Sequence, residues 1–180
     1  MSQQPKKVYV ALLRGINVGG HKKILMADLK ALFETIGFTE IQTYIQSGNV
    51  VFSSEKEDDL ADKITAAIES KYSFNVPILI KKASEMAQIL SKCPFSAEKM
   101  EKSYFILLQE NPSVENLEEA TALSSPDEEF HIIDDCVYIY YSKGAGKAKL
   151  GINFFEKELK VNATARNYRT MAKLLELTSL

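Results

Sequence analysis

The stretch that decides the fold is VYVALLRGINVGG, residues 8–20, which joins an apolar run to a glycine-rich loop. The run at 8–13 does not alternate with polar residues, and at this length it predicts a strand buried on both faces. The glycines that follow permit positive φ and a close backbone approach. We therefore expect a central strand that ends in a tightly turned loop.

A helix is expected next, because apolar residues recur at helical spacing: Leu25, Leu29, Leu32, Phe33 and Ile36. Gly37 is placed to end it. Strand-like segments at 38–45 and 50–52 then flank the turn Gln46-Ser47-Gly48-Asn49, which predicts a hairpin.

The first half closes with a second helix and a fourth strand. Ser54 and Glu57 fit a capping box, and Leu60, Ile64 and Ile68 mark the inward face of the helix. Residues 76–80 form another continuous apolar strand. The order β-α-β-β-α-β is that of the ferredoxin-like split βαβ motif.

The second half repeats this order less clearly. A short helix at 83–90 and a boundary at 91–94 come first. Strands are expected at 104–108, 130–133 and 137–141, with a helix capped by Ser113 after the first strand and a hairpin turn at Asp134-Asp135 between the other two. A mobile loop at 143–147 and helices at 154–159 and 168–177 follow. No final strand is evident. We expect an α+β protein with a ferredoxin-like N-terminal subdomain at 1–93 and a related C-terminal α+β subdomain with terminal helices at 94–180. Strands apolar on both faces need cover, so the two sheets should pack into one unit.

Composition limits the class of protein. The 180 residues are 46% hydrophobic and 26% charged, with a net charge of -2, which is typical of a globular chain and disfavours extended nucleic acid as a partner. The two cysteines, Cys93 and Cys136, indicate a reducing compartment. No run approaches the roughly 20 apolar residues of a membrane span. These features predict a soluble, cytoplasmic protein without a membrane partner.

A candidate ligand site follows from the topology. In an antiparallel sheet the loop after the first strand and the central hairpin emerge at the same edge, which brings together Arg14, Asn17, Gly19, Gly20, Lys22, Lys23, Gln46, Ser47 and Asn49. Glycine amides can form an anion-binding nest, and an arginine adds a charged fork for phosphate or carboxylate. The same residues are also compatible with a turn whose asparagines satisfy loop amides and whose lysines are solvated.

A second basic region lies toward the C-terminus and consists of Lys147, Arg166, Asn167 and Arg169, with Lys143 and Lys149 nearby. A solvated loop for the lysines and ion pairs with acidic runs for the arginines explain these residues better than ligand contact does. Whether the two basic regions form one site is open. Lys147 is not a phosphate-loop lysine, because Tyr141 stands where the first glycine belongs and Ala148 replaces Ser or Thr. His21 and His131 lack metal-ligand spacing, so neither a metal nor a cofactor is expected.

Four segments carry a family resemblance. They are residues 10–20, which include Arg14-Gly15-Ile16-Asn17-Val18-Gly19-Gly20; Met26-Ala27-Asp28-Leu29; residues 43–52; and the closing Ala163-Thr164-Ala165-Arg166-Asn167-Tyr168-Arg169-Thr170. They resemble the bacterial domain of unknown function 1697 family, in which a tryptophan usually stands at the position of Tyr168. The resemblance implies paired ferredoxin-like subdomains. It implies no activity and no catalytic residues.

Three functions therefore remain open. The favoured one is binding of a small phosphorylated or anionic molecule, such as a nucleotide, through the Arg14–Gly20 loop and the Gln46–Asn49 hairpin. An enzyme acting on a phosphate or acyl group at the same edge is the second, although no general base is apparent. The third is a structural or protein-interaction module, including a homo-oligomer. The sequence does not decide whether the protein is an enzyme.

Overall fold

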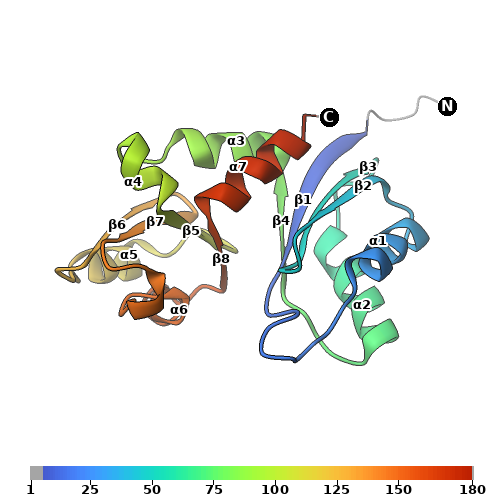
Figure 1. Ribbon diagram of the computed structural model, residues 1–180, viewed down its shortest axis with the longest axis horizontal. Coiled ribbons are helices and arrows are strands. Elements are labelled where there is room, and N and C mark those ends of the chain that lie inside the picture. The colour runs from blue at the N-terminus through green and yellow to red at the C-terminus, as the bar shows by residue number, and fades with distance from the viewer. Residues whose placement is uncertain (1–5, 180) are drawn as a thin grey trace. The chain divides into compact units, whose positions relative to one another are not determined.

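The computed structural model describes residues 6–179 and contains two four-stranded antiparallel sheets (Figure 1). The first sheet consists of β1 Lys7–Leu13, β2 Thr39–Tyr44, β3 Asn49–Ser54 and β4 Ile78–Lys82, in the spatial order β2-β3-β1-β4. Helices α1 Met26–Thr35 and α2 Leu60–Tyr72 lie on one face of this sheet. The predicted βαββαβ order of the first half is confirmed.

The first core lies between this sheet and its two helices. Alternate residues of β1 (Tyr9, Ala11 and Leu13) belong to this core together with Phe33 of α1 and Phe52 of β3. The opposite face of β1 is also fully buried, since Val10 and Leu12 have no exposed surface. This double burial is what the unbroken apolar run predicted.

Two details of the helix ends differ from the prediction. Leu25 precedes α1 as its N-cap residue and is 69% exposed, so it does not belong to the inward face. Ser54 ends β3 and cannot cap α2, which begins six residues later at Leu60. The Ser54 hydroxyl instead accepts a hydrogen bond from the Lys56 amide in a local turn. The expected role of Gly37 is confirmed, because it follows α1 with a φ of 95°.

The second sheet has the same topology as the first. It consists of β5 Ser103–Leu108, β6 Glu128–Ile133, β7 Cys136–Tyr141 and β8 Ala163–Asn167, in the spatial order β6-β7-β5-β8. Its core includes residues of α5 Val114–Thr121 and α6 Ile152–Leu159. The expectation that no final strand exists is therefore wrong. β8 has few apolar residues in its sequence, Ala-Thr-Ala-Arg-Asn, but it pairs along its whole length with β5.

The remaining helices are α3 Ala83–Ser91, α4 Ala97–Glu101, α7 Tyr168–Leu177 and the 3₁₀ turn η1 Ala145–Lys147. The chain divides into two compact units, one running to Ala87 and including the chain from Lys173 onward, the other spanning Gln88–Ala172. The predicted subdomain boundary and the packing of the two sheets stay predictions.

Local signals in the second half are confirmed at two turns. Ser113 caps α5, where its hydroxyl accepts a hydrogen bond from the Asn116 amide at 3.2 Å. Asp134 has a φ of 52° in the two-residue turn between β6 and β7, as a hairpin requires.

Both cysteines are free thiols. Between residues 6 and 179, no helix combines the length and the apolar character that crossing a membrane requires.

Gly48 lies where the β2–β3 hairpin meets the end of β1. A Cβ atom at this position would stand 2.6 Å from the Leu13 Cβ atom, and the glycine has a φ of 81°. Both the crowding and the backbone conformation exclude a side chain. We predict that Gly48→Ala lowers the free energy of unfolding by about 3 kcal/mol. Gly146→Ala is the control, because an added Cβ atom there meets no neighbour within 4 Å. Equal denaturant midpoints for the two variants would contradict this role for Gly48.

Candidate functional site

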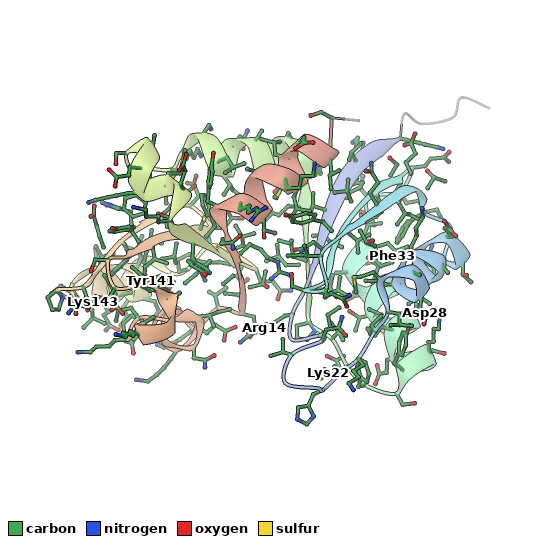
Figure 2. All side chains as sticks on the ribbon, in the orientation of Figure 1. Arg14, Lys22, Asp28, Phe33, Tyr141 and Lys143 are labelled. Atoms are coloured by element: carbon green, nitrogen blue, oxygen red, sulfur yellow. The ribbon has the colours of Figure 1, made fainter. Side chains whose placement is uncertain are left out.

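The loop after β1 and the β2–β3 hairpin meet at one end of the first sheet. We call residues 14–25 and 45–49 together the loop edge. The Leu13 amide donates a hydrogen bond to the Gly48 carbonyl at 2.8 Å, and the Arg14 amide donates to the Pro77 carbonyl at 3.0 Å. The structure thus brings together the segments that the sheet topology placed side by side. Figure 2 shows Arg14 and Lys22 in this loop.

The side-chain amide of Asn17 holds the loop edge together. Its Nδ2 atom donates to the carbonyls of Ile24 at 2.9 Å and of Gln46 at 2.8 Å. Its Oδ1 atom accepts from the Ile24 amide at 2.9 Å. The residue has a φ of 56°, a conformation that asparagine tolerates better than most residues. Asn17 therefore fixes both ends of the loop to the hairpin through one side chain.

Asn49 has a comparable structural role inside the hairpin. It is fully buried, and its Nδ2 atom donates to the Tyr44 carbonyl at 3.0 Å and to the Ser47 hydroxyl at 2.9 Å. Among the predicted site residues, Asn17 and Asn49 therefore shape the edge. Contact of either side chain with a ligand stays a prediction.

The cationic residues of the loop edge lie at its surface. Arg14 is half-buried, and Lys22 and Lys23 are exposed. The Lys22 ammonium donates to the Asn75 carbonyl at 2.6 Å, which places it over the segment that leads into β4. The loop edge contains no Asp or Glu, so these three cations give it a formal charge of +3 within a chain of net charge -2.

Two glycine amides of the same loop are available for hydrogen bonds. Gly19 and Gly20 are exposed and have φ values of 57° and 79°. Within residues 6–179, neither amide donates a hydrogen bond. Successive N–H groups in a turn of this kind can converge on an anion. The positive φ expected at these glycines is confirmed, and close approach of their backbone to a ligand stays a prediction.

Three exposed apolar residues stand next in sequence to the residues that the Asn17 hydrogen bonds join, and their exposure was not predicted from the sequence. Val18, Leu25 and Ile45 are 64%, 69% and 50% exposed. Val18 follows Asn17, Leu25 follows Ile24, and Ile45 precedes Gln46. Only the exposure of Val18 could have been predicted from the sequence, because this residue lies inside the glycine-rich loop. Apolar residues gathered on exposed loops mark binding surfaces more often than scattered ones do.

The second basic region does not form one cluster. Arg166 lies on β8, at one edge of the second sheet, and is 9% exposed. Its Nη1 atom donates to the Thr164 hydroxyl at 3.0 Å and to the Ala165 carbonyl at 2.9 Å. Burial lowers the pKa of the Arg166 guanidinium to about 10, so it is charged at neutral pH. Asn167 caps α7 by accepting from the Thr170 amide at 2.9 Å, and Arg169 is exposed.

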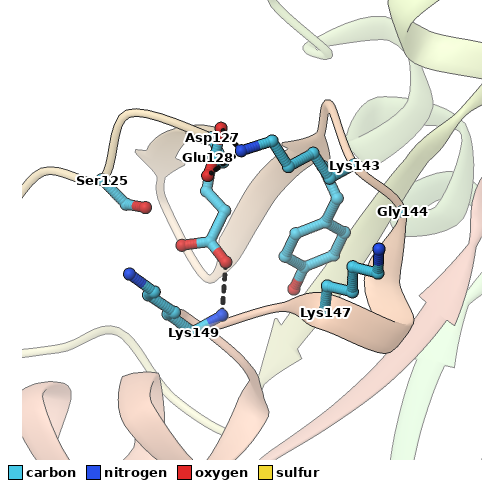
Figure 3. Close-up of a pocket in the computed structure, with 8 residues that line it drawn as sticks. Ser125, Asp127, Glu128, Lys143, Gly144, Lys147 and Lys149 are labelled. Carbon is cyan, nitrogen blue, oxygen red and sulfur yellow. Dashed lines mark hydrogen bonds and ion pairs between the residues drawn. The ribbon is translucent and has the colours of Figure 1, made fainter.

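Lys147 lies at the other side of the same sheet, in a small pocket next to β6 and β7 (Figure 3). The Glu128 carboxylate there accepts hydrogen bonds from the amides of Lys149 and Leu150, and the Lys143 ammonium pairs with Asp127 at 2.8 Å. Burial is the main cause that raises the pKa of Tyr141 to about 12. The cavity holds about 20 Å³, which is room for roughly one water molecule. This pocket therefore fixes a loop and is too small for a substrate.

Two larger hollows lie outside the loop edge. One, of about 270 Å³, is lined by Phe38 and Ser53 at the opposite end of the first sheet, and the other, of about 370 Å³, follows β6. Neither includes a residue of the loop edge. In the described part of the chain, no three His, Cys, Asp or Glu side chains are placed to hold a metal ion.

Ile45 combines exposure with an unfavourable backbone, since its φ is 48°. A β-branched residue in this region is strained, whereas asparagine tolerates it. We predict that Ile45→Asn raises the free energy of unfolding by about 0.5–1 kcal/mol, as measured by urea denaturation. Thr43→Asn, in the extended backbone of β2, should lower stability instead. Loss of more than about 1 kcal/mol in Ile45→Asn would show that the isoleucine is needed for folding rather than for contact with a ligand.

Comparisons with known proteins agree with the fold and give no activity. The model of a family described as a protein of unknown function, DUF1697, matches residues 7–138. The match excludes the closing segment at 163–170, so the resemblance of that segment stays a prediction. The conserved bacterial protein SP0830 from Streptococcus pneumoniae has a similar structure, with a TM-score of 0.75 and 21% identity over 97% of this chain and 99% of its own. No curated protein matches the sequence.

Proposed function

The chain belongs to the DUF1697 family of proteins of unknown function, and we propose that its loop edge binds a small phosphorylated or anionic molecule. The observation that carries the proposal is the concentration of positive charge there. Arg14, Lys22 and Lys23 lie in one loop without any carboxylate, beside the glycine amides at 19 and 20 that donate no hydrogen bond within the described residues.

Arg14 is the residue best suited to select the anion. A guanidinium can donate two parallel hydrogen bonds to phosphate or carboxylate. The Arg14 backbone is fixed to Pro77, so the residue starts from a defined position at the end of β1. Lys22 and Lys23 add charge without the planar fork of arginine, because an ammonium acts as a point charge. The polar groups of Gln46 and Ser47 border the same surface and can read the uncharged part of the ligand.

The exposed apolar side chains narrow the class of ligand. Val18, Leu25 and Ile45 give an inorganic ion nothing to contact, but they can cover a planar or apolar group. A phosphorylated molecule with such a group, for example a nucleotide, can contact both the cations and the apolar side chains of the loop edge. Because the site is open to solvent, its electrostatic part should weaken as salt screens the charges.

A thermal-shift experiment at fixed low salt tests the proposal, with nucleotides, sugar phosphates, inorganic phosphate and a short RNA as probes. A ligand that binds only the folded state at a hundred times its Kd stabilises the protein by about 2.7 kcal/mol. We predict that one class of phosphorylated probe raises the melting temperature of the wild type and that Arg14→Ala abolishes the increase. Lys30→Ala, which removes one exposed positive charge from α1, should keep it.

The melting temperature of unliganded Arg14→Ala shows whether that variant is folded, and Lys23→Ala provides a second test at an exposed side chain. An increase of the same size in all three variants would exclude the loop edge as the anion site.

A protein-interaction role is the second candidate, and the exposure of Val18, Leu25 and Ile45 favours it. Apolar side chains ringed by cations are also what an acidic protein partner would contact. No thermal shift with any probe, together with a partner captured by the wild type and lost in Leu25→Ser, would replace the small-ligand proposal by this one.

A further inference from the structure

β6 is an edge strand whose outer side has no neighbouring strand within the described residues. It pairs with β7 over six consecutive positions, from Glu128 opposite Tyr141 to Ile133 opposite Cys136, without a register shift. An uninterrupted edge of this kind exposes a row of backbone donors and acceptors. Such an edge is a template for another strand unless the sequence prevents pairing.

The other three edges carry a register shift, lysines or an arginine, and β6 carries none of these; its two charged residues are Glu128, whose carboxylate is bound by the amides of Lys149 and Leu150, and the exposed Glu129. β2 has a register shift between Thr39 and Gln42, β4 ends in Lys81-Lys82, and β8 contains Arg166. Bulges and strand cations are two of the devices that keep edges from associating. The sequence of β6, Glu-Glu-Phe-His-Ile-Ile, contains neither a cation of the Lys or Arg type nor a proline. The difference points to an edge that is kept open for a partner.

A groove runs beside this edge. It has a volume of about 370 Å³ and is lined by every residue of β6 and by Thr121, Leu123 and Ser124, at and beyond the end of α5. Leu123 is 40% exposed and is one of the few large apolar side chains at the surface. An added strand can therefore gain main-chain hydrogen bonds from β6 and apolar contact from the groove, which is the mode called β-augmentation.

We propose that the partner is a second copy of this chain, joined by antiparallel pairing of β6 with itself. A two-fold axis through Phe130 places Glu129 opposite His131 of the partner subunit, and the same pair forms again across the axis. No two carboxylates then face each other. The imidazole N–H can donate to the carboxylate, and cross-strand pairs of this kind stabilise sheets. The result is one continuous eight-stranded sheet with an isologous interface.

The two residues that form this pair are on the accessible face of the strand. Glu129 and His131 are both exposed, whereas Phe130 and Ile132 pack against the second core. Within one chain, the Glu129 carboxylate pairs with the Lys99 ammonium, and it lies 3.7 Å from the His131 Nε2 atom. The Lys99 pair is solvent-exposed and therefore weak, so exchanging the charges of β6 should cost the monomer little stability. The proposal is independent of ligand binding at the loop edge.

The test is the mass of the intact chain in solution, measured by light scattering across a wide concentration range. The wild type should approach twice the 20.2 kDa chain mass as its concentration rises. His131→Glu should raise the dimer Kd at least tenfold, because it sets two carboxylates opposite each other. Combining His131→Glu with Glu129→Lys restores opposite charges and should restore the dimer. Thr39→Glu, which adds the same charge to the edge of the first sheet, is the control and should leave the mass unchanged.

Circular dichroism on each variant confirms that it is folded. A constant mass of one chain at all concentrations overturns the proposal and would leave the groove to an extended peptide of another protein. A dimer that responds to Thr39→Glu but not to the β6 variants overturns the assignment of the interface to β6.

Discussion

The side-chain amide of Asn17 is the interaction on which the loop edge depends. Ile16 and Ile24 anchor the loop at 14–25 in the first core, where each is 1% exposed, and backbone contacts such as the Asn17 amide to the Lys22 carbonyl at 3.1 Å fold it locally. The polar contacts between this loop and the hairpin depend on the Asn17 side chain. The amide of Asn17 joins Ile24 to Gln46 and so makes loop and hairpin one surface. A charged surface that is already ordered binds with a smaller entropic penalty than a loop that must order itself.

This constraint also explains the unusual residues nearby. The loop reverses direction through residues with positive φ, including Gly19, Gly20 and Lys22. The hairpin does the same at Ile45 and Gly48, and the second of these touches Leu13 too closely for any side chain. Strain and positive φ are therefore gathered where the two segments meet. Residues held in such conformations persist where the surrounding structure fixes them, which often happens at binding surfaces.

Much of the fold could be predicted from the sequence, for definite reasons. The apolar run predicted β1 and Gly37 predicted the end of α1, because both patterns are local in the sequence. The antiparallel order of the strands then predicted that the loop and the hairpin lie at the same end of the sheet. β8 was missed because Ala-Thr-Ala-Arg-Asn shows no strand pattern, and its pairing with β5 is a tertiary effect. Leu25 was misplaced because helical spacing alone cannot show that a helix begins one residue later.

The candidate site was predicted at the level of segments and not of side-chain roles. The sequence shows that Asn17, Asn49 and Arg166 are polar, but it cannot show that Asn49 and Arg166 are buried or what the two asparagines bond. It also cannot separate Lys147 from Arg166, which lie at opposite sides of the second sheet. Such facts depend on three-dimensional contacts that no local pattern encodes.

Amide hydrogen exchange on the wild type and on Asn17→Gly is the most direct test of the role of Asn17, because glycine keeps the positive φ and removes only the side chain. We predict that the Ile24 amide, which donates to the Asn17 side chain, exchanges much faster in the variant, and that protection at β1 and β3 is retained. Unchanged protection of Ile24 would contradict the account, since the loop edge would then be held by contacts other than the amide of Asn17.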